Sequence, residues 1–285
     1  MSVRLRRAEP SDAAVLGDIC YRAFKHIAEA HGFLPDFPSV EAAVGAMTML
    51  TGHQAFYGLV AEADGRIIGS NFLDERNPIS AVGPITTDPQ LQNEGAGRAL
   101  MAEVLRRSHE RGFAGVRLVQ AGYHCRSLAL YAKLGFGARE QLACLQGPAI
   151  GGVAPGHEVR TATPADIAAC HVLCFEVHGH ARGGELADAV ARGSARVVER
   201  DGRITGYTTQ IAFFGHAVAR SNDDLWALIA TAEDFGGPGF LLPTRNHILL
   251  RRALESGLRI TQTLTLMTNG LYNEPAGAWL PSIGY

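Results

Sequence analysis

Hydrophobic and polar positions follow two different periods along the chain, and each period predicts its own kind of element. Apolar residues recur four positions apart from Gly97 onwards, so we expect a helix that ends near Gly112. Mostly apolar runs at residues 67–73 and 116–120 predict strands. This mixture of helical and strand periods predicts an α/β or α+β fold.

Several short patterns occur twice in the chain, in the same order. Residues 6–12 (RRAEPSD) match residues 160–166 (RTATPAD), and both predict a strand, a proline turn and an Asp near a helix start. Residues 64–69 (DGRIIG) match residues 201–206 (DGRITG), and both predict a tight hairpin turn at Asp-Gly. A third pair lies further along the chain, where residues 134–136 (LGF) match residues 256–258 (SGL). Because the spacing between the copies shrinks from 154 to 137 to 122 residues, we infer a duplication whose second copy lost loops.

The length of the chain agrees with a duplication. At about 100–200 residues per domain, 285 residues predict two domains, with one large α/β domain as the alternative. The stretch from Gly147 to Gly156 is rich in glycine and proline and carries no charge, as linkers often do. We therefore expect a first domain at residues 1–147, a linker at 148–156 and a second domain at 157–285.

Composition and charge narrow the class of partner. Hydrophobic residues make up 47% of the chain and charged residues 19%, which is typical of a globular protein. The net charge of −2 predicts no nucleic-acid partner and no attraction to an anionic membrane. No apolar run is long enough to span a bilayer, and the five cysteines form no CxxC pair. We therefore expect reduced thiols and a cytoplasmic location.

The segment between residues 82 and 100 is the best candidate for chemistry. A strand is expected to end at Thr87, and a turn of the form Gln92-x-x-Gly95-x-Gly97 then leads into a helix. Such a turn points free N–H groups at the positive end of the helix dipole, which favours a phosphate. A glycine turn that merely enters a helix has the same pattern, so the motif alone leaves both interpretations open. No Gly-Lys-Ser/Thr follows, which excludes a Walker loop.

A second element, His124 to Phe136, adds a family resemblance. Together the two elements resemble the acetyl-CoA site of the GNAT superfamily of acyl-CoA N-acyltransferases, in which the glycine loop cradles the CoA pyrophosphate and the second element flanks the pantetheine and thioester. The resemblance runs from Val3 to about Leu145, and the second half looks like a degenerate copy. The chain also resembles bacterial tandem-GNAT proteins, through HGFLPDFP at residues 31–38 and GSNFLDER at residues 69–76.

This resemblance implies the fold and the cofactor contacts. It implies two GNAT-like domains, each a mixed, mostly antiparallel twisted sheet flanked by helices, and acetyl-CoA as co-substrate with no metal. The implied contacts are Ile85, Thr86, Thr87, Gln92, Asn93, Glu94, Gly95, Ala96, Gly97, Arg98, His124, Ser127 and Tyr131. Asn93 stands where the superfamily usually has Gly, and His124 stands where it usually has Asn. An imidazole can still donate one hydrogen bond to the cofactor.

The resemblance further implies direct acetyl transfer to an amine, for which we expect a small-molecule acceptor. By its position Tyr131 is the general acid that protonates the leaving thiolate. An alkyl ammonium must lose a proton before it attacks. Asp74 and Glu75 end the strand of residues 67–73, and because neighbouring strand residues face opposite sides, at most one of them faces the substrate. Of the two, we expect Glu75 as the base. Phe33, Asp36 and Phe37 are expected to bind the acceptor, although their loop could instead pack on the first helix.

Two alternatives remain at this stage. Cys170, Cys174 and His178 are spaced four apart, and with His171 and His180 nearby they could hold zinc. However, Cys174 matches Cys20 of the first copy, which has no such histidines, so a core role is favoured. The alternative function is a non-catalytic module that senses acetyl-CoA and passes the signal through the second domain.

The second copy should bind no CoA. At the spacing of 122 residues, Tyr131 corresponds to Ala253 and Ser127 to Leu249. The helix expected at residues 224–232 follows Ser-Asn-Asp, which has no glycine and places carboxylates where a pyrophosphate would lie.

Overall fold

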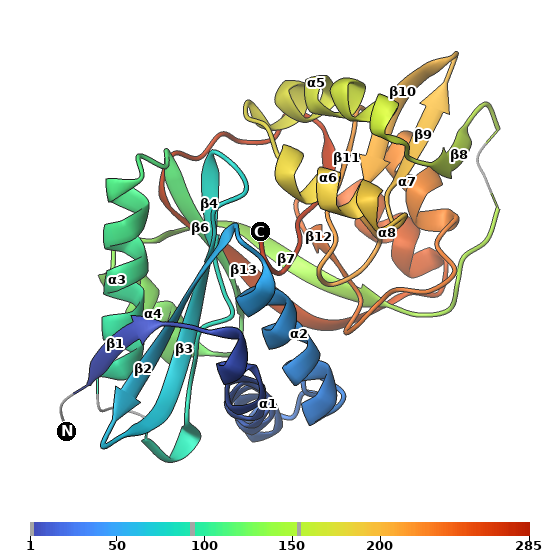
Figure 1. Ribbon diagram of the computed structural model, residues 1–285. Coiled ribbons are helices and arrows are strands. Elements are labelled where there is room, and N and C mark those ends of the chain that lie inside the picture. Colours follow the sequence, from blue (N-terminus) through green and yellow to red (C-terminus); the bar gives the residue numbers. More distant parts are fainter. Residues whose placement is uncertain (1–2, 92–94, 153–154) are drawn as a thin grey trace.

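A computed structural model describes residues 3–91, 95–152 and 155–285, and the predicted contacts Gln92, Asn93 and Glu94 lie outside this range. The two halves follow one another with similar element orders (Figure 1). The first half contains β1 (Arg4–Arg7), α1 (Ala13–Ala30), α2 (Val40–Gly52), β2 (Phe56–Ala63), β3 (Arg66–Asp74), β4 (Ile79–Val82), β5 (Thr86–Thr87), α3 (Ala96–Glu110), β6 (Gly115–Ala121), α4 (Cys125–Lys133) and β7 (Gly137–Gln146). The second half contains β8 (Glu158–Thr161), α5 (Ile167–His178), α6 (Gly183–Ala191), β9 (Arg196–Arg200), β10 (Arg203–Thr208), β11 (Ala217–Ala219), α7 (Asn222–Ala230), β12 (Phe240–Pro243), α8 (His247–Glu255), β13 (Arg259–Gly270) and β14 (Ala278–Leu280).

The strands of the described residues form two sheets. The larger sheet has the order β1-β2-β3-β4-β6-β13-β7-β12, with β5 also paired to β3. The smaller sheet has the order β14-β11-β10-β9-β8. All pairs between these strands are antiparallel except β4 with β6. The predicted fold class, with mixed and mostly antiparallel sheets flanked by helices, is confirmed.

The halves exchange strands in the larger sheet. β13 from the second half lies between β6 and β7 of the first, and β12 from the second half pairs with the other edge of β7. Strands of the two halves therefore alternate at this end of the larger sheet, whereas the smaller sheet contains strands of the second half only. The division at residues 148–156 stays a prediction, and hydrogen bonds of one continuous sheet cross between the halves.

Helices cover both faces of the first half of the larger sheet (Figure 1). Neighbouring residues Leu59 and Val60 of β2 point to opposite faces, as the strand period requires. Leu59 packs with Leu100 of α3, whereas Val60 packs with Leu16 of α1. The α3 and α4 helices thus lie on one face and α1 and α2 on the other.

The repeated sequences fold into repeated contacts. The Arg6 guanidinium donates to both oxygens of Asp12 at 2.7 and 2.9 Å and also to a glutamate of β2. In the second half, Arg160 donates to both oxygens of Asp166 at 2.8 Å and also to a glutamate of β9. Each arginine lowers the pKa of its aspartate. The predicted strand, proline turn and helix start are therefore present in both halves.

Both predicted Asp-Gly hairpins are also present. Asp64 and Gly65 have φ angles of 50° and 73°, and Asp201 and Gly202 have φ angles of 53° and 71°. Two successive left-handed residues are the hallmark of the type I′ turn, which glycine and aspartate tolerate best.

Candidate active site

The larger sheet opens between two of its central strands. β4 and β6 pair only from Ile79 to Ala81. Pro84 has no N–H to donate, so the strand predicted to run to Thr87 is interrupted and resumes as β5. β5 stays with β3, while β6 continues along β13 to Ala121. The two sides of the sheet therefore separate beyond Ala81 and leave a gap.

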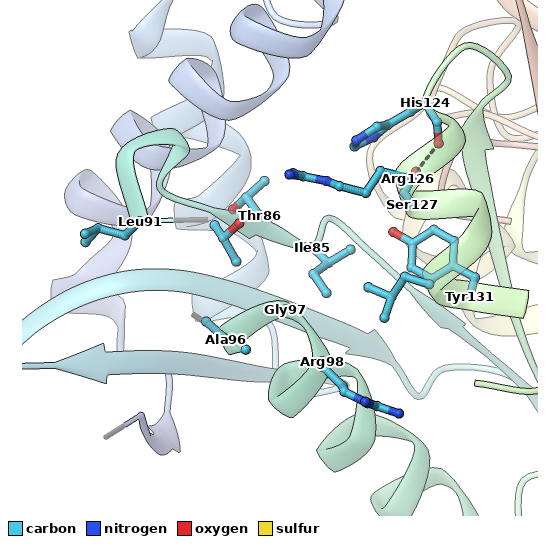
Figure 2. A pocket seen from close by; sticks show the side chains of 13 residues that line it. Ile85, Thr86, Leu91, Ala96, Gly97, Arg98, His124, Arg126, Ser127 and Tyr131 are labelled. Carbon is cyan, nitrogen blue, oxygen red and sulfur yellow. Dashed lines mark hydrogen bonds between the residues drawn. The ribbon is translucent and has the colours of Figure 1, made fainter. Parts of the chain in front are cut away.

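A cavity of about 300 Å³ lies at this gap, between β5, the start of α3 and α4 (Figure 2). Its lining consists of Ile85, Thr86, Thr87, Leu91, Gly95, Ala96, Gly97, Arg98, His124, Arg126, Ser127, Leu130 and Tyr131. The structure thus brings together all described residues for which we predicted acetyl-CoA contacts. The prediction missed Leu91, Arg126 and Leu130.

The N-terminus of α3 lies at the cavity with its backbone donors available. Gly95 precedes the helix in the left-handed conformation, with φ of 85°, and among the described residues no side chain forms a capping hydrogen bond there. A Cβ at Gly97 would come within 3.8 Å of Thr87 Cγ2, so a larger side chain there would extend into the lining. An uncapped helix start beside glycines suits a phosphate group, which fits the pyrophosphate of CoA.

Tyr131 projects from α4 into the cavity, with its hydroxyl towards Ile85 (Figure 2). The ring is 7% exposed and packs edge-on against Phe136. Burial raises the pKa of this phenol to about 12, so the hydroxyl remains protonated at neutral pH. The side chain can therefore donate a proton to a group bound in the cavity.

His124 and Ser127 form the opposite wall. Burial, together with the nearby Arg126 and His31, lowers the pKa of His124 to about 4, so the imidazole is neutral. The Ser127 hydroxyl is 2.9 Å from the carbonyl oxygen of His124 and 3.2 Å from the Gln120 Oε1. The Gln120 amide nitrogen is buried with no described partner. This wall is polar but uncharged, apart from Arg126.

Glu75 lies elsewhere. Its carboxylate accepts hydrogen bonds from the Arg107 guanidinium of α3 at 2.5 and 2.9 Å, and Arg107 in turn lies over the Tyr57 ring. Glu75 does not line the cavity. The neighbouring Asp74 is bound to Arg76. The structure therefore does not bring the predicted base together with Tyr131.

The three predicted acceptor residues divide between two surroundings. Phe37 is buried in the core of α1 and α2, with its ring centroid 6.0 Å from that of Phe24. Phe33 instead stacks on Tyr123, which directly precedes His124, at 4.4 Å. Asp36 lies between them and is bound by Gln262 of β13. The loop therefore packs on the first helix at one end and reaches the end of β6 at the other.

The residues that we did not predict differ in how far the sequence could have indicated them. Arg126 lies one position before the predicted contact Ser127, where a cation could meet a phosphate. Leu91 and Leu130 add only apolar surface. Gln262 has no local signal, because it reaches Asp36 only through the strand exchange.

Cys170, Cys174 and His178 are buried in α5. Cys170 and Cys174 pack with Leu173 and Val197, and His178 meets the Trp279 ring edge-on. Throughout the described part of the chain, no three His, Cys, Asp or Glu side chains are grouped so that they could hold a metal ion. Nor does any described helix combine the length and apolarity needed to cross a membrane.

Comparison with protein families decides the identity of the first half. Residues 24–136 match the acetyltransferase (GNAT) family, and this range contains every residue of the cavity. The chain contains a GNAT domain. The matched range includes the glycine turn before α3, the opening of the sheet and the α4 helix that carries Tyr131. None of the curated proteins matches the chain.

Solved structures extend the GNAT fold over the whole chain. A candidate acetyltransferase from Pyrococcus horikoshii is 16% identical with a TM-score of 0.79, over 99% of this chain and 95% of that one. A GCN5-related N-acetyltransferase from Sphaerobacter thermophilus is 16% identical with a TM-score of 0.62, over 95% and 96%. A tandem GNAT protein from the clavulanic acid biosynthesis pathway is 15% identical with a TM-score of 0.57, over 94% and 98%. The chain therefore shares the fold of tandem GNAT proteins.

Proposed function

We propose that this protein is an acetyl-CoA-dependent N-acetyltransferase that transfers the acetyl group directly from the thioester to a small-molecule amine. One observation carries the proposal. The uncapped start of α3, which suits a pyrophosphate, and the protonated Tyr131, which suits a leaving thiolate, line the same cavity at the opened sheet.

The pyrophosphate, the pantetheine arm and the thioester of acetyl-CoA each have a matching surface. The pyrophosphate lies against the turn at Gly95 and Gly97, where backbone N–H groups and the helix dipole favour negative charge. Arg126 reaches into the cavity from α4 and adds positive charge (Figure 2). The pantetheine arm passes along β5 towards the wall of His124 and Ser127, and the thioester lies near Tyr131.

The reaction then needs few groups. The amine nitrogen attacks the thioester carbonyl carbon and forms the C–N bond, and a backbone N–H of residues 85–87 donates to the resulting oxyanion. As the C–S bond breaks, the hydroxyl of Tyr131 gives its proton to the sulfur. The tyrosinate recovers a proton from the nitrogen of the new amide. No covalent enzyme intermediate forms.

The acceptor binds on the other face of the opening, against the loop that carries Phe33, Asp36 and Phe37. A single carboxylate with aromatic neighbours suits a small amine. In this proposal residues 1–147 form the catalytic domain, and residues 157–285 form a copy that binds no CoA. A cytoplasmic location is part of the proposal, since all five cysteines are free.

Release of CoA thiol tests this function. The full chain is incubated with acetyl-CoA and a panel of primary amines that includes ethanolamine, tyramine, spermidine and L-lysine. Calorimetry with CoA runs alongside. We expect one CoA per chain and amine-dependent turnover, with the acetylated amine detected by mass spectrometry. Tight CoA binding without turnover of any amine would identify a sensing module instead.

A further inference from the structure

The strand exchange places a side chain of the second half against a carboxylate of the first. Asp36 lies in the loop between α1 and α2, and its Oδ1 accepts a hydrogen bond of 3.3 Å from Gln262 Nε2 of β13. The two residues are 226 positions apart. Among the described residues, no cation lies within ion-pairing distance of Asp36. The carboxylate therefore has one neutral donor and no counter-ion.

The titratable groups of other elements that are raised in pKa by the charge of Asp36 are also neutral at pH 7. They are Cys20 of α1, Tyr123 after β6 and Cys144 of β7. Burial together with the charge of Asp36 raises the pKa of Tyr123 to about 12 and that of Cys144 to about 11. The pKa of Cys20 is raised for the same reasons. Burial raises the pKa of Asp36 itself to about 6, although the bond from Gln262 lowers it.

A second acceptor atom belongs to the same pair. Gln262 is 6% exposed, and its Oε1 is buried with no described hydrogen-bond partner. A carboxylate and an amide oxygen on hydrogen-bonded side chains form a site that has acceptors but lacks donors. A primary ammonium group offers three N–H donors and one positive charge, which is what this pair lacks.

This pair lies at the end of the opened sheet. Gly122, which directly follows β6, donates its N–H to the carbonyl oxygen of Thr263, the neighbour of Gln262. Phe33 and His31, from the loop of Asp36, both stack on Tyr123. His31 is also close enough to His124 of the cavity to lower its pKa. The loop of Asp36 thus adjoins the cavity wall.

We propose that Asp36 is the base that removes a proton from the acceptor ammonium, and that Gln262 of the second half positions it. This inference rests on the proposed function. The ammonium N–H bond breaks and its proton passes to the Asp36 carboxylate. The freed lone pair then attacks the thioester, and the protonated Asp36 returns its proton to solvent after the product leaves. The second half therefore completes the acceptor site.

The decisive variant is Asp36→Asn, which keeps the shape and removes the base. We expect kcat/KM for the best amine to fall by roughly 10²–10⁴-fold at pH 7.5, with CoA affinity unchanged in calorimetry. The deficit should shrink towards pH 10, because more of the amine is already deprotonated there. Asp223→Asn removes an exposed carboxylate of α7 that is bound to Arg252, and it serves as the matched control with unchanged activity.

The pH profile separates a base from a structural group. In the wild type, kcat/KM should rise through pH 6 as Asp36 loses its proton, and Asp36→Asn should lack this rise. Gln262→Met removes the hydrogen bond that lowers the pKa of Asp36, so the rise should move to higher pH by roughly 0.5–1 unit. A merely structural role for Gln262 would lower activity at every pH and leave the rise in place.

The outcomes distinguish this inference from the proposed function. If the wild type acetylates an amine but Asp36→Asn keeps activity within threefold and the same profile, the inference is wrong and the function stands. If the wild type acetylates none of the amines, both are wrong. If Asp36→Asn loses CoA binding through misfolding, the profile of Gln262→Met decides. An unmoved rise then overturns the inference.

Discussion

The two halves begin corresponding helices in opposite ways. In the first half, α3 follows Gly95, and no side chain in the described part of the chain caps its N-terminus. In the second half, Ser221 caps α7, and the fully buried carboxylate of Asp224 accepts hydrogen bonds from Thr205 at 2.7 Å and from Arg200. The second half thus carries its own anion where the first leaves the helix end open. Under the proposed function, the helix start of the first half takes its negative charge from a ligand, whereas that of the second half takes it from its own chain.

The helices that follow, α4 in the first half and α8 in the second, also differ in whether their side chains line a cavity. α8 starts and ends 122 residues after α4, as the sequence spacing predicted. Ser127 and Tyr131 of α4 line the cavity, whereas Leu249 and Ala253 of α8 are buried in an apolar core. In the second half, apolar side chains therefore occupy the helix positions that line the cavity in the first half.

Adding a charge at the open helix should produce the largest effect. Gly97→Glu places a carboxylate against the pyrophosphate, and we expect CoA affinity in calorimetry to fall by roughly 100-fold or more. Gly97→Ala is the matched control, because its Cβ would make an ordinary contact of 3.8 Å with Thr87. If Gly97→Glu binds CoA as well as Gly97→Ala does, the phosphate site lies elsewhere.

Removing the hydroxyl of Tyr131 tests its proposed role as the general acid, for which the second half has no counterpart. Tyr131→Phe keeps the ring in its pocket and should lower kcat by roughly 10²–10⁴-fold, with little change in CoA affinity. Steady-state rates at saturating acetyl-CoA measure this loss. A decrease of less than threefold would mean that water protonates the thiolate.

The buried carboxylate of Asp224 should contribute a few kcal/mol to the free energy of unfolding. Asp224→Ala leaves Thr205 and Arg200 without their acceptor, so we expect the free energy of unfolding to fall by about 2–4 kcal/mol. Urea unfolding measures it. Asp223→Ala, at the preceding and exposed position, is the control and should cost less than about 0.5 kcal/mol. Binding of a second CoA to the Asp224→Ala protein would show that the carboxylate alone had closed the site.

The smallest effect is expected at the arginine–aspartate contact that both halves share. Arg6→Ala and Arg160→Ala each break the same contact with the aspartate at a helix start, and the two arginines are 29% and 34% exposed. We expect each to lower the free energy of unfolding by about 1 kcal/mol, and the two losses to agree. A loss in one half alone would show that the second copy no longer relies on this contact.

The sequence predicted what depends on neighbours along the chain. The Asp-Gly turns and the arginine–aspartate pairs need only residues within one short segment, and they formed in both halves. The residues that line the cavity were named from the resemblance to the GNAT superfamily, whose two elements each lie in one short segment. Prediction was weaker where two distant segments meet. Glu75 gave no sign that Arg107 of α3 would face it.

The pairing of Asp36 with Gln262 shows the same limit more sharply. No period or motif around residue 262 indicates that β13 would enter the sheet of the first half, since a strand pattern does not reveal its partner. The duplication even pointed the other way, because it favours two self-contained copies. Of this pair, the sequence indicated Asp36 as a candidate, whereas Gln262 had to come from the structure.

The exchanged strands also have a consequence for synthesis. A ribosome makes β6 and β7 well before β13, the strand that borders both of them in the finished sheet. Until residue 270 has emerged, each has an edge without its final partner, and such edges invite pairing with other chains. A truncated product would contain every residue of the cavity but lack the strand that holds β6 in place. Correct assembly of the cavity thus depends on completion of almost the whole chain.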